Sequence, residues 1–590
     1  MQHCFDNLYA QSVNGQNFYD LMKLISSNEN IRLAYRNIKR NTGSKTAGTN
    51  KLTIDDIKDL SVEKVIEHVQ NMFQSYEPES VRRVFIDKGN GKVRPLGIPT
   101  IWDRIVQQCI LQVLEPICEA KFHKHSYGFR PNRSTHHAKA RLESLINMVG
   151  LYHCIDVDIK GFFDNVHHSK LLKQVWALGI KDKALLSIIS KLLKAEIEGE
   201  GVPTKGTPQG GILSPLLSNI VLNELDWWVS NQWETFQSNH EYKHNGSKVK
   251  ALKKSNLKEC YIVRYADDFK VLCRTRSQAI RMNYAIKDFL NNRLQLETSE
   301  EKSKVINLKK NSSEFLGFSF RAIRKGKTRF GYVAQSNMTK KAKSNALIKI
   351  KDSIKAIQKK PCNETVWHYN TVVMGIQNYY APATEIMKNL SELNSHLNKT
   401  LYNRLKNLRK EAKFSDMSNT LQKRYRGSKS RLYKIQNMVF IPIYAQRHKT
   451  NLCFSQDICN YTVNGREKIH KNLKAINKNV LSYVMKNFIP NRSIEYNDNR
   501  ISKFIAQYGR CAISRVELGL SDWHCHHKIP YHLSKNDRYS NLIVLHETVH
   551  RLVHLKDKEK IKTLLKDLKL NNKQKEKVNE LRKQCNNDSI

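Results

Sequence analysis

Acidic side chains are scarce in this chain, and the marks of a secreted or membrane protein are missing. Its 590 residues include 54 Asp and Glu against 100 Lys and Arg, a formal net charge of +46 at pH 7. The 12 cysteines form no C-x-x-C pair, which excludes a disulfide framework and predicts reduced thiols in a cytosol-like compartment. Because no basic stretch followed by an apolar run opens the chain, and no apolar run could cross a bilayer, we expect neither a signal peptide nor a membrane partner.

The excess of positive charge is far larger than solubility requires. Lys and Arg recur in nearly every segment and are interleaved with Tyr and Phe. Such a distribution predicts a polyanionic partner, above all nucleic acid, held through phosphate contacts and counterion release. The length predicts several domains, and a hydrophobic content of 40% is enough to build ordinary cores.

A pair of adjacent aspartates is the most informative motif. Asp267 and Asp268 lie in YIVRYADDFKVLC (261–273), where two β-rich apolar runs flank a short acidic turn. Two carboxylates at a hairpin tip between buried strands are costly unless a cation such as Mg²⁺ neutralises them. A solvated turn is the simpler explanation of the pair taken alone, so the interpretation depends on other residues.

A two-metal phosphoryl-transfer site needs about three carboxylates on a rigid platform. The third is expected at the end of a neighbouring strand, and LYHCIDVDIKGFFDN (151–165) has the pattern of such a strand. Asp158 fits best because it follows an apolar alternation and precedes a glycine. Asp156 remains an alternative, and Asp164 also fits an ordinary helix start.

Other segments outline the architecture. Residues 81–100 predict a strand, a glycine-rich turn and a second strand, and residues 206–228 predict a glycine-rich turn that runs into an apolar helix. From about 336 to 495 the pattern is mainly helical and rich in Lys and Arg. From residue 555 the pattern is that of a solvated amphipathic helix.

A cluster of histidines marks a second site near the C-terminal end. The motif residues are His526, His527, Asn541, His546, His550 and His554. The last three recur every four residues, which would place three imidazoles on one helix face. A lone histidine is usually structural, and we assign His524 and His532 that role. The motif as a whole predicts a metal site.

The motifs together resemble the group II intron-encoded reverse transcriptases, or maturases, over nearly the whole chain. DIKGFFDN resembles the first catalytic motif of that family, GTPQGGILSPLLSN its template-side motif, and YADD its catalytic turn. RPLGIPT, SYGFRPNRS, FLGF and GIQNYYAP match further blocks in the expected order, and Arg130 would contact the template backbone. The resemblance implies an α+β right-hand polymerase with an antiparallel palm sheet, a helical thumb and a C-terminal ββα-metal (HNH) module.

The resemblance also implies roles in the polymerase site. Asp158, Asp267 and Asp268 would hold two Mg²⁺ ions, and Phe163 would exclude a 2′-hydroxyl from the incoming sugar. Tyr265 would pack near the primer terminus. The residues expected to bind the incoming dNTP are Lys88 and Arg94 at its triphosphate, and Gln209, Gly210 and Gly211 beside it.

The histidine motif resembles the HNH nuclease domain that many members of this family carry. His527 would be the general base, oriented by a hydrogen bond from Asn541. His526 and His550 would ligate one divalent metal of undetermined identity, with His546 as a further ligand and His554 less favoured. Many members of the family carry paired cysteines that bind a structural zinc beside this motif. The chain departs from that pattern, because CAIS offers only Cys511, and Cys525 lies inside the histidine cluster, so a four-cysteine zinc site is not expected.

We therefore expect an RNA-directed DNA polymerase that binds its intron RNA as a ribonucleoprotein, assists splicing, nicks target DNA and extends the new 3′ end with dNTPs. The expected divisions are residues 1–75 (finger extension), 76–335 (fingers and palm), 336–415 (thumb), 416–495 (basic DNA-binding region) and 496–590 (HNH domain and tail). The expected location is cytoplasmic, in a bacterial cytosol or nucleoid, with an organelle and the oligomeric state left open.

Two other classes of protein share parts of this pattern. The chain could be an RNA-binding splicing factor with a relic polymerase, but the complete acids at 158, 267 and 268 argue against it. It could be a host-defence or diversity-generating reverse transcriptase, but the thumb block and the terminal histidine motif argue against that.

Overall fold

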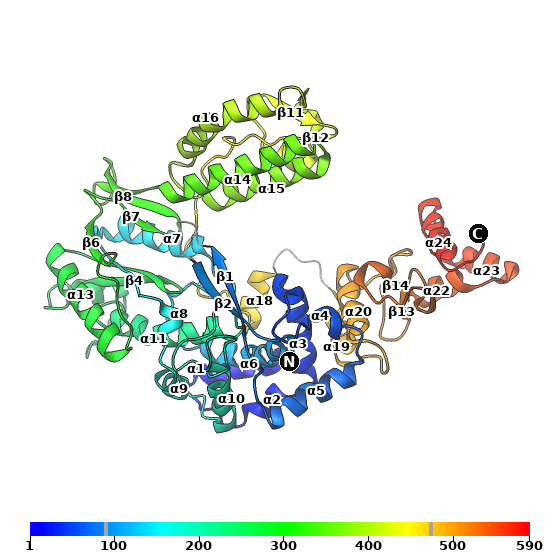
Figure 1. Ribbon diagram of the computed structural model, residues 1–590, viewed down its shortest axis with the longest axis horizontal. Coiled ribbons are helices and arrows are strands. Elements are labelled where there is room, and N and C mark those ends of the chain that lie inside the picture. Colours follow the sequence, from blue (N-terminus) through cyan, green and yellow to red (C-terminus); the bar gives the residue numbers. More distant parts are fainter. Residues whose placement is uncertain (88–92, 471–475) are drawn as a thin grey trace. The chain divides into compact units, whose positions relative to one another are not determined.

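Two compact units make up the structure, a computed structural model that describes residues 1–87, 93–470 and 476–590. The first unit consists of Met1–Lys121, Val166–Leu217 and Cys459–Ile590. The second unit consists of Phe122–Asn165 and Ser218–Ile458 (Figure 1). Each unit is assembled from stretches that lie far apart in the sequence, and the expected five-part division of the chain stays a prediction.

A four-stranded sheet is the centre of the second unit. Its strands are β3 (His153–Val157), β4 (Cys260–Tyr265), β5 (Asp268–Cys273) and β6 (Lys304–Asn307). The order is β4-β5-β3-β6 and every neighbouring pair is antiparallel. The apolar runs around the acidic pair form β4 and β5, which are buried almost throughout. The antiparallel sheet expected from the sequence is confirmed.

Helices and a smaller sheet surround this centre. The helices are α7 (Thr135–Ser144), α8 (Phe162–Asn165), α11 (Ser214–Asn231), α12 (Asn245–Leu252) and α13 (Arg276–Asp288). Helix α13 packs against β3, β5 and β6. It begins where a capping box predicts, because Thr275 and Gln278 satisfy each other's backbone N–H groups. The smaller sheet is β7 (Ser313–Phe315), β8 (Phe318–Arg324) and β9 (Tyr332–Met338).

Three long helices follow in the same unit, as the sequence predicts. They are α14 (Lys340–Lys359), α15 (Asn363–Tyr380) and α16 (Ile386–Leu405), which lie side by side in Figure 1. Apolar residues at helical spacing, such as Leu390, Leu393 and Leu397 of α16, are buried between them. The helical expectation is wrong further on, where short strands β10 (Lys410–Ala412), β11 (Leu432–Ile435) and β12 (Met438–Val439) accompany α17 (Asn419–Arg424).

The first unit is mostly helical. Its elements before residue 218 are α1 (Gln2–Val13), α2 (Leu21–Ile25), α3 (Asn28–Arg40), α4 (Ile54–Ile57), α5 (Val62–Gln74), β1 (Arg82–Asp87), β2 (Val93–Ile98), α6 (Ile101–Glu119), α9 (His168–Ala177) and α10 (Lys183–Leu193). Strands β1 and β2 pair antiparallel, as expected for residues 81–100. Helix α6 is buried along most of its length because α1, α2, α3 and α5 pack around it.

The C-terminal elements belong to this same unit. They are α18 (Val463–Ile469), α19 (Lys478–Lys486), α20 (Ile494–Ala506), β13 (Trp523–His527), α21 (Tyr531–Ser534), β14 (Leu542–His546), α22 (Glu547–His554), α23 (Lys558–Leu568) and α24 (Asn572–Gln584). Helix α20 is fastened to α3 by buried polar contacts. The Tyr35 hydroxyl donates to Glu495 at 3.0 Å, and Lys39 Nζ lies 2.8 Å from Glu495 and 3.0 Å from Asp498. None of the described helices combines the length and apolar character needed to cross a membrane.

Candidate functional site

The acidic pair lies at the tip of a two-residue hairpin. In the β4–β5 register Tyr265 faces Asp268, so Ala266 and Asp267 form the turn. Ala266 has φ of 57°, the left-handed value that primed hairpin turns need at their first position. Two carboxylates are thereby held side by side at one end of the central sheet.

The pairing of β3 with β5 brings the third carboxylate to the same end. Val157 faces Phe269 in this register, so continuing it by one residue sets Asp158 opposite Asp268. The side chains of Asp158 and Asp268 are each 44% exposed. Beyond the strand, the Asp158 carbonyl accepts a hydrogen bond from Ser299 N at 2.8 Å, which ties the segment down. Three side chains with oxygen donors therefore face solvent at one end of the sheet, where β3, β4 and β5 end or turn.

The surroundings of Asp156 distinguish it from Asp158. Asp156 is 7% exposed, and Ser313 Oγ donates to both of its carboxylate oxygens at 2.9 Å. It also forms an ion pair with Lys270 at 3.3 Å. Asp158 instead pairs with the exposed Lys302 at 3.1 Å. Asp158 is thus the accessible carboxylate of the two. Asp164 lies in the first turn of α8, as its alternative reading predicts.

Lys270 is a buried cation beside the acids that the sequence reasoning missed. Its Nζ lies 3.8 Å from Asp268 Oδ1 and 3.3 Å from Asp156 Oδ1. Desolvation raises the pKa of Asp268 to about 6; Lys270 opposes this rise, and the charges of Asp267 and Asp156 add to it. Lys270 and Lys302 together do not balance the four carboxylates of Asp156, Asp158, Asp267 and Asp268, and a divalent cation would supply the missing charge. The available signal was a lysine two residues after Asp268 in an otherwise apolar strand.

Arg264 is a second residue that the sequence reasoning missed, and it anchors the hairpin through its guanidinium. Its fully buried guanidinium contacts both carboxylate oxygens of Asp226 at 2.6–2.9 Å. It also donates to Asn219 at 3.0 Å and to the carbonyl of Ala266, in the turn itself, at 2.7 Å. Asn219 in turn donates to the carbonyl of Gly128 at 2.9 Å. Helix α11 therefore holds the hairpin through one charged network.

The segment around Gly128 presses against the hairpin from the side. Tyr127 N donates to the Arg264 carbonyl at 2.9 Å, so the segment runs along β4. A Cβ atom on Gly128 would stand 2.2 Å from Ala266 N, so only glycine fits this approach. Arg130 is 6% exposed and donates to the carbonyls of His123 and Ser126. The expected contact of Arg130 with template is therefore wrong, because its guanidinium is used inside the loop.

The remaining predicted polymerase residues fall into two groups. Phe163 and Tyr265 belong to the same unit as the acids, and the Phe163 ring stacks edge-on against Phe162 at 5.3 Å. Gln209 and Gly210 belong to the other unit. There Gln209 accepts from Gly97 N at 2.7 Å, and a Cβ on Gly210 would stand 2.6 Å from Gly97 O.

The glycine-rich turn thus packs on strand β2, which also carries the exposed Arg94. A Cβ atom on Gly211 would stand 2.9 Å from Ser214 Oγ, so this glycine also sits tightly. Lys88 lies outside the described residues.

The histidine motif folds as two strands and a helix in the first unit. β13 and β14 pair antiparallel, with His527 opposite Leu542, and α22 follows directly. His526, His550 and His554 each bring one ring nitrogen within 4.8 Å of the others, and His526 Nδ1 lies 3.3 Å from His554 Nε2. The three imidazoles can hold one metal ion.

The expected ligand His546 lies outside this group. Helix α22 begins at Glu547, so His546 is its N-cap, and Nδ1 contacts the Thr548 hydroxyl at 2.8 Å. The expectation that His546 is a further ligand is therefore wrong, and His554, one turn beyond His550, joins the group instead. The four-residue repeat predicts one helix face, but α22 contains only its last two members, His550 and His554.

Burial keeps these imidazoles in the metal-binding form. Desolvation, with the neighbouring histidines adding to it, lowers the pKa of His526 to about 3 and that of His550 to about 4. Both rings are neutral at neutral pH, as metal ligation requires. His526 and His550 line a cavity of about 530 Å³ together with His527, Arg492 and Arg500.

The partner of His527 differs from the expected one. Its Nε2 lies 2.7 Å from Asp537 Oδ1, and the ring stacks on Tyr496 at 5.3 Å. The Asn541 side chain instead accepts from Ile529 N at 2.9 Å and donates to the carbonyl of Asn536 at 3.0 Å. The expected hydrogen bond from Asn541 to His527 is therefore wrong: Asn541 closes the loop, and the buried Asp537 orients the imidazole.

Comparison with known proteins gives consistent matches. Residues 86–320 match the family described as reverse transcriptase (RNA-dependent DNA polymerase). Protein YkfC of Escherichia coli is 33% identical over 327 residues, which cover 53% of this chain and 84% of YkfC. Group II intron-encoded protein LtrA of Lactococcus lactis is 32% identical over 431 residues, 61% of this chain and 69% of LtrA. Nuclear intron maturase 2 of Arabidopsis thaliana is 26% identical over 177 residues, 23% of this chain and 24% of that protein.

The Gly128 contact predicts a steric effect. Gly128→Ala should lower the midpoint of urea unfolding, with a cost of about 2–3 kcal/mol, because the added methyl must displace the hairpin tip. Gly375→Ala is the matched control, since Gly375 lies in α15 with nothing within 4 Å of the added Cβ. The control should be neutral or slightly stabilising. Equal midpoints for the two variants would refute the close approach.

The buried ion pair predicts strong coupling. Arg264→Leu should destabilise the protein by about 3–5 kcal/mol because it strands the Asp226 charge in the interior. The double variant Arg264→Leu, Asp226→Leu should recover much of that loss, since both charges are then gone. Urea unfolding followed by tryptophan fluorescence measures both. Losses that simply add in the double variant would contradict the pairing.

Proposed function

This chain belongs to the family of group II intron-encoded reverse transcriptases and maturases, and on that premise we propose that Asp158, Asp267 and Asp268 form its DNA-polymerising site. The observation that carries the proposal is the register of β3, β4 and β5, which supports a common edge for all three carboxylates. Membership of the family makes the chain an RNA-directed DNA polymerase. The proposal adds the residues that perform the reaction.

The donor set fits hard divalent cations. Three solvent-facing carboxylates at one end of the sheet favour Mg²⁺, which prefers oxygen ligands and keeps room for phosphate. Two such ions would activate the primer 3′-hydroxyl and stabilise the leaving pyrophosphate. Arg264 and Gly128 would keep the carboxylates at fixed positions during the reaction.

The chain's other residues would select and hold the substrate. Phe163, which is half-buried and belongs to the same unit as the acids, would meet the sugar of the incoming nucleotide and exclude a 2′-hydroxyl. Tyr265 would support the primer terminus. Arg94, exposed on β2, and Lys88 would neutralise the triphosphate, and the turn of Gln209 and Gly210 would border the base.

The polymerase proposal is tested by removing one metal ligand. Asp268→Asn should lower dNTP incorporation on a primed RNA template by about a thousandfold or more, because metal binding contributes several kcal/mol to the transition state. Asp288→Asn makes the same chemical change at an exposed residue of α13 and should leave incorporation unchanged. Retained synthesis in Asp268→Asn would remove this residue from the site.

We further propose that intron RNA is the partner and that the protein assists splicing by binding it. The net charge of +46 supports a large phosphate-contacting surface. In this role the protein stabilises the folded RNA, while the RNA carries out its own transesterifications. The relatives named as intron-encoded protein and intron maturase support the assignment.

The third proposal is a DNA-nicking site at the histidine cluster. His527, oriented by Asp537, would take a proton from the attacking water, and a metal at His526, His550 and His554 would polarise the scissile phosphate. Three neutral imidazoles suit a transition ion such as Zn²⁺ better than Mg²⁺. The nicked target strand would then supply the primer that the polymerase site extends into cDNA.

A matched pair of histidine variants tests the metal site. His554→Ala should lower the zinc bound per chain about tenfold or more, since an ion held by three imidazoles loses one of them. His546→Ala should leave it unchanged because that ring caps α22. Plasma mass spectrometry after equilibration with Zn²⁺ measures the metal, and nicking of target DNA should follow the same order. Loss of zinc in His546→Ala but not in His554→Ala would refute the ligand set.

A further inference from the structure

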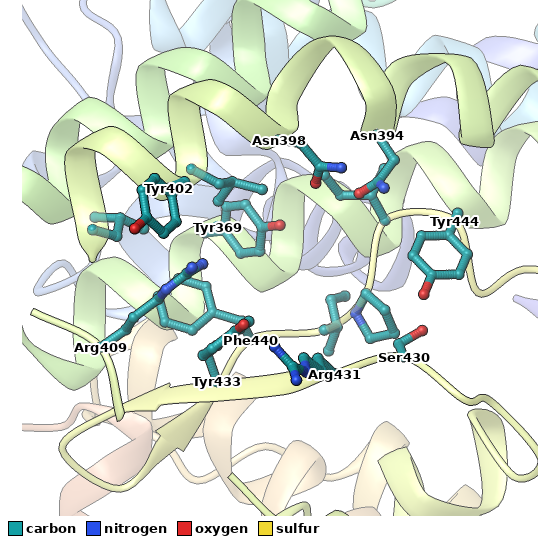
Figure 2. Close-up of a pocket in the computed structure, with 15 residues that line it drawn as sticks. Tyr369, Asn394, Asn398, Tyr402, Arg409, Ser430, Arg431, Tyr433, Phe440 and Tyr444 are labelled. Atoms are coloured by element: carbon teal, nitrogen blue, oxygen red, sulfur yellow. The ribbon is translucent and has the colours of Figure 1, made fainter. Parts of the chain in front are cut away.

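A cavity in the second unit has no role in either catalytic site. It has a volume of about 420 Å³ and lies between helices α15 and α16 and the chain from Ser430 to Tyr444 (Figure 2). Sites for small organic molecules typically measure about 300–1,000 Å³, so one nucleotide-sized group fits.

The Tyr369 hydroxyl points into this cavity. Tyr369 is 2% exposed, and its ring packs against that of Phe440 with the centroids 5.3 Å apart. Figure 2 shows that hydroxyl directed into the space that the pocket residues surround. A hydroxyl that faces a cavity can both donate to and accept from a polar ligand there.

Two amides extend the polar wall. Asn394 and Asn398 lie four residues apart, one turn on the same face of α16, and both line the cavity. Neither side chain has a partner among the described residues. Amides offer both donors and acceptors, which is what the edge of a nucleobase requires.

Flat side chains form the other walls. Tyr402 is 56% exposed and Tyr444 is 41% exposed, although both line the cavity. The Arg409 guanidinium carbon lies 3.8 Å from the ring centroid of Tyr433 and 5.8 Å from that of Tyr402. Aromatic rings and guanidinium planes are the surfaces on which unstacked bases are held.

The floor of the cavity is fixed in advance. Asn370 of α15 donates to the Val439 carbonyl at 2.8 Å and accepts from Ile441 N at 2.9 Å. Gln377, two turns further along α15, donates to the carbonyls of Pro442 and Ile443 at 2.8 and 3.0 Å. A pocket that is already formed loses little entropy when it binds its ligand.

The surrounding charge favours a ligand that carries phosphate. Residues 406–434 contain ten Lys and Arg against two Asp and Glu. Arg431 lines the cavity itself and is exposed. We propose that this cavity binds one unstacked nucleotide of an RNA strand, with the base between the aromatic walls and the phosphates on the basic rim; the choice of RNA rests on the partner proposed above.

Photo-crosslinking tests the pocket in the full-length chain. The probe is a short single-stranded RNA that carries 4-thiouridine, irradiated at long wavelength, and the crosslinked peptides are mapped by mass spectrometry. Crosslinks are expected at Tyr402, Tyr433 or Tyr444. Asn394→Leu should reduce their yield about fivefold, because the base edge loses its hydrogen bond and its space. Tyr369→Phe, which keeps the ring and loses only the hydroxyl, should reduce it in the same direction.

Asn403→Leu is the matched control, because Asn403 is an exposed residue of the same helix that does not line the cavity. It should crosslink as the unaltered protein does, and total RNA binding by filter assay should change less than about twofold in every variant, since the basic surface is untouched. RNA bound without crosslinks in the pocket, or equal yields in Asn394→Leu and Asn403→Leu, would overturn the pocket.

Two further measurements distinguish a free nucleotide from a nucleotide within a strand, and distinguish failure of the cavity proposal from failure of the RNA-partner proposal. Competition by free UMP or AMP would show that the pocket accepts a lone nucleotide, and its absence would show that the strand is needed; either result supports a nucleotide site. Failure of the unaltered protein to bind the RNA at all would count against the RNA partner, and with it the choice of RNA for this cavity.

Discussion

The Arg264 guanidinium, enclosed between β4 and α11, is the interaction on which the acidic hairpin depends. A two-residue turn with an alanine at positive φ is strained by about 1–3 kcal/mol, and the carbonyl of that alanine is held by Arg264. A buried ion pair adds little net stability, but it fixes geometry when every donor is used. Asp226, Asn219 and the Ala266 carbonyl use the donors here, so carboxylates that repel each other are kept at one place.

The sequence could predict the parts of this site that follow from local pattern. Alternation of apolar residues defined β3, β4 and β5, and the acids stand at their ends, so Asp158 and the hairpin pair were identified together. Lys270 and the Arg264–Asp226 pair could not be identified in that way. Their partners are chosen by sheet order and by the packing of α11, and neither is encoded in a local period.

The histidine site shows a finer limit of sequence reading. The residues of the motif were recognised, but the ligand set depends on where helix α22 begins, and a boundary one residue past His546 turns that ring from ligand into cap. Likewise, the hydrogen-bond partner of His527 is Asp537 and not Asn541, because the Asn541 side chain is used in hydrogen bonds to the backbone of its own loop. The cavity beside α15 and α16 could not be predicted for a related reason. Composition predicts a basic segment there, but only the folded chain brings its aromatic and amide side chains together around one space.

The contact between α3 and α20 has a consequence for how the chain matures. Tyr35 and Lys39 find their acidic partners only at Glu495 and Asp498, 460 residues later in the case of Tyr35. During translation α3 can pack against α6 once both have emerged, but Tyr35 and Lys39 stay without their acidic partners until α20 follows. A ribosome stalled before residue 495 would leave these two side chains exposed on an otherwise folded N-terminal part, where a chaperone or nucleic acid could contact them.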